Sequence, residues 1–233
     1  MGGCCGKNSK EAQIEKDLKS GKKPILWIVG GPGLDTYFKV FTFNSYFFLT
    51  LTYLRSRSGK GTQCTRLAQK YKLAHISSGD LLRAEVLNGS ELGKKLNEIM
   101  ETGQLVPREI VLDLLKKGMI EWYEGSNGFL IDGYPREVIQ GKEFEEKIGP
   151  CTKIVYFEVS DAVMKQRLMQ RGKDSGRVDD NEETIANRIK IFHELSEPVI
   201  QEYASIVLTI SGEQEPDDVF NQCCENLDPL FKT

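Results

Sequence analysis

Short apolar runs alternate with helical stretches along most of the 233-residue chain. A continuous apolar run of strand length, without polar alternation, is typical of a strand buried on both faces. Five segments are predicted as strands: residues 25–29, 73–76, 129–131, 154–157 and 206–210. Helical composition or spacing predicts helices at 11–20, 61–71, 80–88, 91–101, 108–123, 137–148, 161–171, 182–203 and 217–227. This alternation predicts an α/β fold whose mostly parallel sheet is covered by helices on both faces.

Two stretches depart from this regular pattern. Residues 173–181 are polar and contain a glycine, which predicts a loop. Pro198 lacks a backbone N–H donor, so it predicts a bend or an interruption in the helix over residues 182–203.

The composition is that of an ordinary globular protein, with 39% hydrophobic and 28% charged residues. The length suits one domain that carries small subdomains. A net charge of −3 argues against a basic nucleic-acid-binding surface, so we expect no nucleic acid partner. The six cysteines include no C-x-x-C pair and are scattered along the chain, which indicates reduced thiols and a cytoplasmic protein.

The two halves of a phosphate-binding loop follow the first predicted strand. Gly30-Gly31-Pro32-Gly33 comes directly after the strand, and Ser58-Gly59-Lys60-Gly61-Thr62 opens the next helix. Joined together, they would present successive backbone N–H groups and the positive end of a helix to phosphate oxygens. Lys60 would add a charge for the β- and γ-phosphates. As written, 24 residues separate the halves, and the geometry of such a loop tolerates few extra residues.

The separating segment, residues 34–57, contains eight of the chain's 19 Phe and Tyr residues and no Gly or Pro. Three hypotheses account for it. The favoured one is a translated intron or an error in the gene assignment, since 24 residues correspond to 72 nucleotides and preserve the reading frame. The second is a genuine splice variant that folds but is catalytically impaired. The third is a membrane or partner contact through its apolar side chains.

A carboxylate lies at the end of another predicted strand. Asp132 directly follows the apolar run 129–131. Ligands of parallel sheets bind at the carboxyl ends of the strands, and beside a phosphate loop a carboxylate there is expected to hold Mg²⁺, through water.

Several longer motifs resemble the adenylate kinase family, of the cytosolic type with a short lid. They are the two glycine clusters with residues 58–64, SSGDLLR at 77–83, GQLVP at 103–107, GFLIDGYPREVIQ at 128–140, QRG at 170–172 and SGRVDDNEET at 175–184. The resemblance covers nearly the whole chain outside the N-terminal tail and residues 34–57. It implies a three-layer P-loop nucleoside monophosphate kinase fold and reversible phosphoryl transfer from MgATP to AMP, giving two ADP.

The resemblance also implies a role for each matching residue. The ATP-binding residues would be Gly31, Gly33, Ser58, Gly59, Lys60, Gly61, Thr62 and Arg171. The AMP-binding residues would be Ser78, Arg83, Gln104, Val106, Gly133, Arg136, Gln140, Arg177 and Arg188. The catalytic residues would be Lys60, Arg136, Arg171, Arg177 and Arg188, with Asp179 and Asp180 pairing with arginines. So many arginines fit the chemistry, because two polyanionic nucleotides must be held in line while their charges are neutralised.

The resemblance implies boundaries, a cofactor and an acceptor. Residues 1–23 form a tail and helix, and residues 24–233 form the kinase domain, with an AMP-binding subdomain at 77–106 and a short lid at 172–182. Mg²⁺ is the expected cofactor, and no zinc is expected, because the lid lacks Cys and His. Ser78 and the Gly133-Tyr134-Pro135-Arg136-Glu137 run favour AMP over the acceptors of UMP/CMP kinase, the alternative reading. A monomer is implied.

The N-terminus carries candidate lipidation sites. Gly2 occupies the acceptor position for a myristoyl chain, although position 6 is glycine instead of the usual Ser or Thr. Cys4 and Cys5 are candidates for palmitoylation. Two acyl chains would anchor a protein stably, whereas one binds marginally. Two hypotheses stay open, a peripheral membrane-tethered protein and an unmodified tail.

Overall fold

The computed structural model describes residues 4–32, 59–175 and 181–231. Five parallel strands form one sheet in the order β2-β3-β1-β4-β5. The strands are β1 (Ile25–Gly30), β2 (Ala74–Ser77), β3 (Phe129–Asp132), β4 (Lys153–Glu158) and β5 (Val207–Ser211). All five predicted strands are therefore confirmed, and no end moves by more than one residue. The central strands β1 and β3 are buried almost throughout, as their apolar runs predict.

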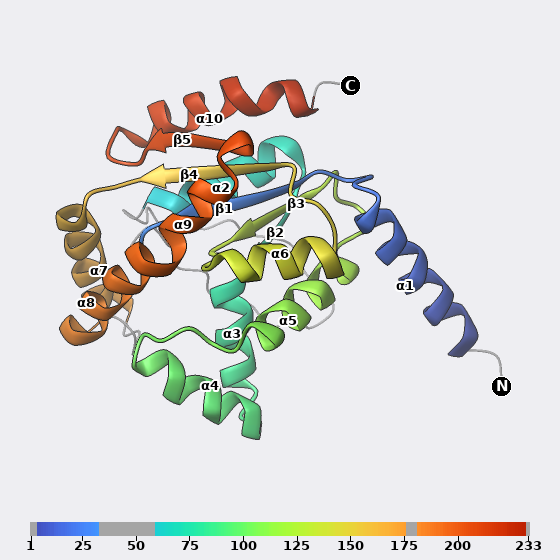
Figure 1. Cartoon of the computed structure of the whole chain (residues 1–233), viewed down its shortest axis with the longest axis horizontal. Coiled ribbons are helices and arrows are strands. Elements are labelled where there is room, and N and C mark those ends of the chain that lie inside the picture. The colour runs from blue at the N-terminus through green and yellow to red at the C-terminus, as the bar shows by residue number, and fades with distance from the viewer. Residues whose placement is uncertain (1–3, 33–58, 176–180, 232–233) are drawn as a thin grey trace, which may run out of the picture.

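Helices cover both faces of the sheet, which confirms the α/β fold class (Figure 1). They are α1 (Cys4–Lys19), α2 (Gly59–Tyr71), α3 (Ser78–Leu87), α4 (Glu91–Glu101), α5 (Arg108–Glu121), α6 (Val138–Lys147), α7 (Asp161–Ser175), α8 (Glu182–Ile191), α9 (Glu197–Glu202) and α10 (Pro216–Phe231). Within the described residues, no helix is both long enough and apolar enough to cross a bilayer.

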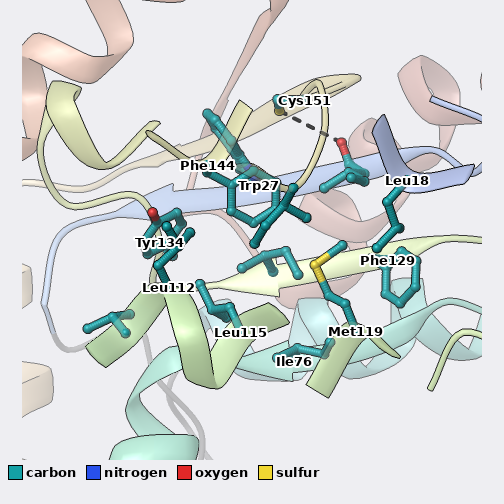
Figure 2. Close-up of a cluster of buried hydrophobic side chains, with 14 of the residues drawn as sticks. Leu18, Trp27, Ile76, Leu112, Leu115, Met119, Phe129, Tyr134, Phe144 and Cys151 are labelled. Carbon is teal, nitrogen blue, oxygen red and sulfur yellow. Dashed lines mark hydrogen bonds between the residues drawn. The ribbon is translucent and has the colours of Figure 1, made fainter. Parts of the chain in front are cut away.

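The two faces of the sheet carry separate hydrophobic cores, because alternate residues of a strand point to opposite sides. Trp27 belongs to the core shared with α1, α5, α6 and α9, whereas Leu26 and Ile28 belong to the core beneath α2 and α10. Trp27 is fully buried and makes edge-on contacts with the rings of Phe144 and Tyr203, with both pairs of ring centroids 5.3 Å apart. Figure 2 shows Trp27 at the centre of the first core.

The N-terminal segment contributes to this first core. Leu18 of α1 is 1% exposed and packs with Phe129 in the same cluster. The predicted helix over 11–20 is confirmed, but α1 begins earlier, at Cys4. The last part of α1 therefore belongs to the folded body of the protein.

One predicted segment differs from the structure, and one predicted interruption is now located. Helix α7 continues through Ser175, so residues 173–175, predicted as loop, are helical. The predicted helix over 182–203 is divided into α8 and α9 by a π-helix, Phe192–Ser196. Pro198 lies in the first turn of α9, where its missing N–H is tolerated, so the predicted interruption is confirmed and is placed just before the proline.

A helical hairpin, α3 with α4, extends from one edge of the sheet (Figure 1). Ser77 caps α3 by accepting a hydrogen bond from the backbone N–H of Asp80, and Ser90 caps α4 by accepting one from Gly93. The two helices approach closely at Gly93, where a Cβ atom would lie 2.5 Å from the carbonyl oxygen of Glu85. This hairpin lies within residues 77–106, the predicted AMP-binding subdomain.

Candidate active site

A cleft opens where β2 and β3 end and the α3–α4 hairpin begins. All predicted AMP-binding residues that the structure describes line it: Ser78, Arg83, Gln104, Val106, Gly133, Arg136, Gln140 and Arg188. They come from α3, from the segment between α4 and α5, from the segment after β3, from α6 and from α8. The sequence motifs were separated by up to 110 residues, and the parallel sheet brings them to one edge.

A second cleft adjoins the first at the carboxyl end of β1. Gly30, Gly31 and Pro32 line it, and Arg136 and Arg188 line both clefts. A Cβ atom at Gly31 would lie 1.8 Å from Sδ of Met164, so the backbone passes close to α7 here. The first glycine cluster therefore lies beside two guanidinium-bearing residues, as a phosphate site requires.

Gly133 connects the two sides of the first cleft. Its φ is +72°, a left-handed conformation that glycine adopts without a Cβ clash. Its carbonyl oxygen accepts a hydrogen bond from Oγ of Ser78 at 2.9 Å and another from Nε of Arg136 at 3.0 Å. One backbone carbonyl therefore orients two of the predicted AMP-binding residues.

The backbone of Arg136 is fixed at both of its polar groups. Its N–H donates to Oε1 of Gln140 at 2.9 Å, and its carbonyl oxygen accepts from Oγ of Ser196 at 2.8 Å. Gln140 is 3% exposed, and its own backbone carbonyl accepts from the hydroxyl of the buried Tyr134 at 2.7 Å. Because the backbone N–H of Arg136 occupies Oε1 of Gln140, the side-chain amide nitrogen of Gln140 is the group that can donate to a ligand.

Arg83 lies on α3 and forms an ion pair with Asp80 one turn earlier. Both side chains are partly exposed, at 28% and 30%. An ion pair this accessible to solvent contributes little to stability, which is consistent with a residue placed for a ligand.

Arg188 reaches the clefts because α8 docks on the end of α4. Gly103 has a φ of +70°, and a Cβ atom there would lie 2.8 Å from Cγ2 of Thr184 and 3.1 Å from Cγ of Arg188. Oγ1 of Thr184 donates to the carbonyl oxygen of Glu101 at 2.9 Å. These contacts hold Arg188 where both clefts meet.

Asp132 ends β3, as predicted, and lines the first cleft with 5% of its surface exposed. Oδ2 of Asp132 lies 3.6 Å from Nε2 of His75 on the neighbouring strand. A carboxylate at this edge, next to the strand that carries the glycines, fits a hard cation such as Mg²⁺ bound through water.

The other predicted nucleotide-binding residues lie either on helices α2 and α7 or outside the described part of the chain. Arg171 is buried on α7 and lines neither of these two clefts. Gly59, Lys60, Gly61 and Thr62 form the first turn of α2, which confirms that a helix follows the second glycine cluster. Several predicted residues lie outside the described part of the chain: Gly2, Gly33, Ser58, Arg177, Asp179, Asp180 and the whole insertion, residues 34–57.

Sequence reasoning missed several contributors to the site. Leu82, Met100 and Val111 form an apolar part of the first cleft. Val111 could have been found, because it is an apolar residue in the first turns of the helix predicted over residues 108–123. No pattern in the sequence indicates Ser196, because its hydrogen-bond partner Arg136 lies 60 residues away along the chain.

His193 links three helical segments beside the second cleft. It lies in the π-helix, and its ring nitrogens each lie 2.8 Å from a carboxylate oxygen, of Asp161 at the start of α7 and of Glu197 at the start of α9. The hydrogen bond to Asp161, followed by that to Glu197, raises the pKa of His193 above its ordinary value. Phe192 and Ser196 of the same π-helix line the second cleft.

Stability is therefore expected to depend on pH through His193. Because its pKa is raised on folding, its contribution is complete below the unfolded pKa of about 6.5 and is lost as pH rises through the folded pKa. The side chain is 39% exposed, so solvent screening limits the effect to about 1 kcal/mol or less. His193→Gln should flatten the loss of unfolding free energy above neutral pH, measured by urea denaturation. Glu194→Gln, which changes an exposed neighbour that pairs with Lys190, is the matched control. An unchanged pH profile in His193→Gln would contradict the assignment.

The sheet is all-parallel, and arginines gather at its carboxyl edge beside the strand that runs into the first glycine cluster. This arrangement is typical of nucleotide-binding α/β proteins. A model of the adenylate kinase family matches residues 55–207. The adenylate kinase isoenzymes 1 of Sus scrofa and of Homo sapiens are each 48% identical over 219 residues, which cover 93% of this chain and all of the relative. Adenylate kinase 1 of Schistosoma mansoni is 45% identical over 208 residues, 88% of this chain and 93% of the relative. The chain belongs to the adenylate kinase family.

This membership confirms the family predicted from the motifs, together with the predicted class of enzyme, a phosphotransferase acting on adenine nucleotides. The alternative of a UMP/CMP kinase is not favoured by these relatives.

Proposed function

We propose that the chain binds MgATP and AMP tail to tail and transfers the γ-phosphoryl group reversibly, giving two ADP. The observation that supports this most directly is the cleft in which Ser78, Arg83, Arg136 and Arg188 converge from separate parts of the chain. Phosphoryl transfer needs in-line placement and neutralised oxygens more than it needs an acid or a base. Fixed guanidinium groups meet that need because they bond phosphate oxygens in pairs and stay charged.

The acceptor would occupy the first cleft. Ser78, Gln104, Val106 and Gln140 would surround the adenine, and Arg83 and Arg136 would clamp the phosphate of AMP. The apolar side chains along the same cleft would exclude water from the base. Gly133 would let the nucleotide approach the backbone, since no side chain intervenes there.

The donor would occupy the second cleft. The joined glycine loop with Gly31, Gly33, Ser58, Gly59, Lys60, Gly61 and Thr62 would hold the phosphates of ATP, and Asp132 would hold Mg²⁺ through water. Mg²⁺ bound with the nucleotide supplies charge neutralisation at the transferring group. The transferring group would also be contacted by Arg171, Arg177 and Arg188. The lid at 172–182 would close over the site and exclude water, as lids of this enzyme class do. We expect no zinc in this lid.

The segment 34–57 leaves a second candidate, a folded nucleotide-binding protein with little catalytic activity. The family model begins to match at residue 55, so β1 and the first glycine cluster lie outside the matched range. This is consistent with an interruption of the phosphate loop. A membrane or partner contact through the aromatic residues of the segment is the weaker alternative.

The acceptor and the reaction are tested together by measuring ADP formation. MgATP should be combined with AMP, UMP or CMP, using the full chain and a variant that lacks residues 34–57. Turnover with AMP in at least one form of the protein is the expected result. Preference for a pyrimidine monophosphate in the active form would contradict the assignment of the acceptor.

We further propose a monomeric cytoplasmic protein whose N-terminus is a candidate for acylation at Gly2, Cys4 and Cys5. Helix α1 begins at Cys4, so Cys4 and Cys5 are the first two residues of a helix. Cosedimentation with lipid vesicles after expression with a myristoyltransferase tests this. Gly2→Ala should abolish the fraction of the protein that sediments with the vesicles. If that fraction is the same in the variant, acylation at Gly2 is ruled out and the N-terminus is an unmodified tail.

A further inference from the structure

Three side chains with different metal-binding atoms meet on the α2 face of the sheet. Cys64 of α2, His75 of β2 and Asp132 of β3 each offer one ligand atom, and these atoms lie within 4.8 Å of one another. The strand register explains the meeting. Ser77 pairs with Asp132 and His75 with Leu130, so His75 and Asp132 occupy diagonal positions on one face. Leu130 and Cys64 belong to the same buried core, which places that face beneath α2.

The spacing of these atoms is close to that of a tetrahedral zinc site. Zinc bonds of about 2.0–2.3 Å place neighbouring ligand atoms roughly 3.3–3.7 Å apart. Nε2 of His75 and Oδ2 of Asp132 are already 3.6 Å apart. Since all three atoms lie within 4.8 Å of one another, no pair has to close by more than about 1.5 Å to reach this spacing.

The burial and charge of the cluster favour a divalent cation of the zinc class. Cys64 is fully buried and Asp132 is 5% exposed. Among the described residues, Nε2 of His75 is buried and has no hydrogen-bond partner. A thiolate and a carboxylate would neutralise a 2+ ion, and a neutral imidazole would complete the set without adding charge. Mg²⁺ prefers oxygen ligands, whereas sulfur and nitrogen select zinc or cadmium.

We propose that Cys64, His75 and Asp132 bind one Zn²⁺ ion, with water in the fourth position. Binding forms a sulfur–zinc bond, and the thiol proton of Cys64 passes to solvent. The site shares Asp132 with the proposed magnesium site, so zinc draws that carboxylate away from the nucleotide cleft. Zinc bound here is therefore an inhibitor of phosphoryl transfer, at a site outside the lid. This consequence rests on the proposed role of Asp132, whereas the metal site does not.

The binding is tested on the full chain by titration with Cd²⁺, a zinc analogue whose thiolate bond absorbs in the ultraviolet. All proteins carry Cys4→Ser and Cys5→Ser, which removes two competing thiols. One equivalent of Cd²⁺ should produce the thiolate band, and excess Mg²⁺ should not remove it. Zn²⁺ should bind with the same stoichiometry in equilibrium dialysis.

Two variants identify the ligands. Cys64→Ser should abolish the band, and Cys64→Ser and His75→Gln should each weaken Zn²⁺ binding by roughly ten- to a hundredfold or more. Cys151→Ser is the matched control, since Cys151 is also a buried free cysteine but belongs to the other core and should leave the band unchanged. A melting curve confirms that each variant is folded, and His75→Gln decides the matter if Cys64→Ser does not fold. A full-strength band in Cys64→Ser, or unweakened zinc binding in folded His75→Gln, would overturn the site.

Inhibition supplies a separate readout. Zn²⁺ should slow ADP formation at saturating MgATP, a chelator should restore it, and Cys64→Ser should resist it. Cys64-dependent binding without inhibition would contradict the role proposed for Asp132 and leave the metal site in place. Loss of both would overturn the metal site and leave the proposed reaction intact.

Discussion

Removal of residues 34–57 is expected to raise ADP formation from MgATP and AMP by about three orders of magnitude or more. The deletion joins the glycines that follow β1, which ends at Gly30, to those that open α2 at Gly59. Several backbone N–H groups then point at the phosphates together, and a single donor of this kind is worth about 10²–10³ in kcat. The entropy of a longer loop costs only about 1–2 kcal/mol, so the thermal stability of the two proteins should be similar. Initial rates of ADP formation measure the effect.

Two controls separate spacing from composition. A Gly/Ser segment of the same length in place of residues 34–57 should stay inactive, because the halves of the loop remain apart. Lys60→Met in the deletion variant should abolish the gained activity, because the role proposed for Lys60 is to hold the phosphates of ATP. Equal activity of the full chain and the deletion variant would show that the phosphate loop need not be contiguous here, and the interpretation of the segment would be wrong.

Arg136→Ala is expected to reduce kcat by about 10³-fold, measured in whichever form of the protein, full-length or lacking residues 34–57, is active. A guanidinium that stabilises the transferring phosphoryl group is worth 10³–10⁵ in kcat. Arg136 lines both clefts, and its backbone is fixed by Gln140 and Ser196, so its side chain is already oriented. Arg136→Lys should recover little, because an ammonium cannot form paired hydrogen bonds in one plane. Rates at saturating MgATP and AMP give the comparison.

Arg108→Ala is the matched control for this prediction. Arg108 lies at the start of α5 with a side chain that is 43% exposed, and it pairs with Glu143 at 3.1 Å, outside both clefts. Its replacement should leave turnover unchanged. If Arg136→Ala keeps most of the turnover while it stays folded, the arginine is not part of the reaction and the arrangement proposed for the two nucleotides fails.

The sequence predicted the strands well because doubly buried strands have an unmistakable composition. Ile25 to Val29 and Phe129 to Ile131 were predicted from continuous apolar runs, and both are buried in the sheet. Helix ends were harder. Helix α4 begins as predicted, one residue after its cap Ser90, but α3 begins two residues before its predicted start, because Ser77 caps it from the end of a strand. Polar composition predicted a loop at residues 173–175, and helix α7 extends through them.

The candidate site divides in the same way. Ser78, Gly133 and Arg136 could be predicted because each belongs to a continuous stretch of sequence that is recognised as a whole. Ser196 and His193 could not, because their partners lie on other elements and the π-helix that contains them has no sequence signature. Likewise the proximity of Cys64, His75 and Asp132 follows from strand register, which a single sequence does not reveal.

The carbonyl oxygen of Gly133 has one lasting consequence for ligand discrimination. Since Ser78 and Arg136 both donate to this atom, a shift of either donor alters the anchor of the other. In the proposed binding mode, contacts to the nucleobase and contacts to its phosphate are therefore energetically linked, and the linkage must be reciprocal. A nucleoside without its phosphate should therefore bind more weakly than the sum of its separate contacts suggests. Its base contacts lose affinity when the phosphate contact is missing.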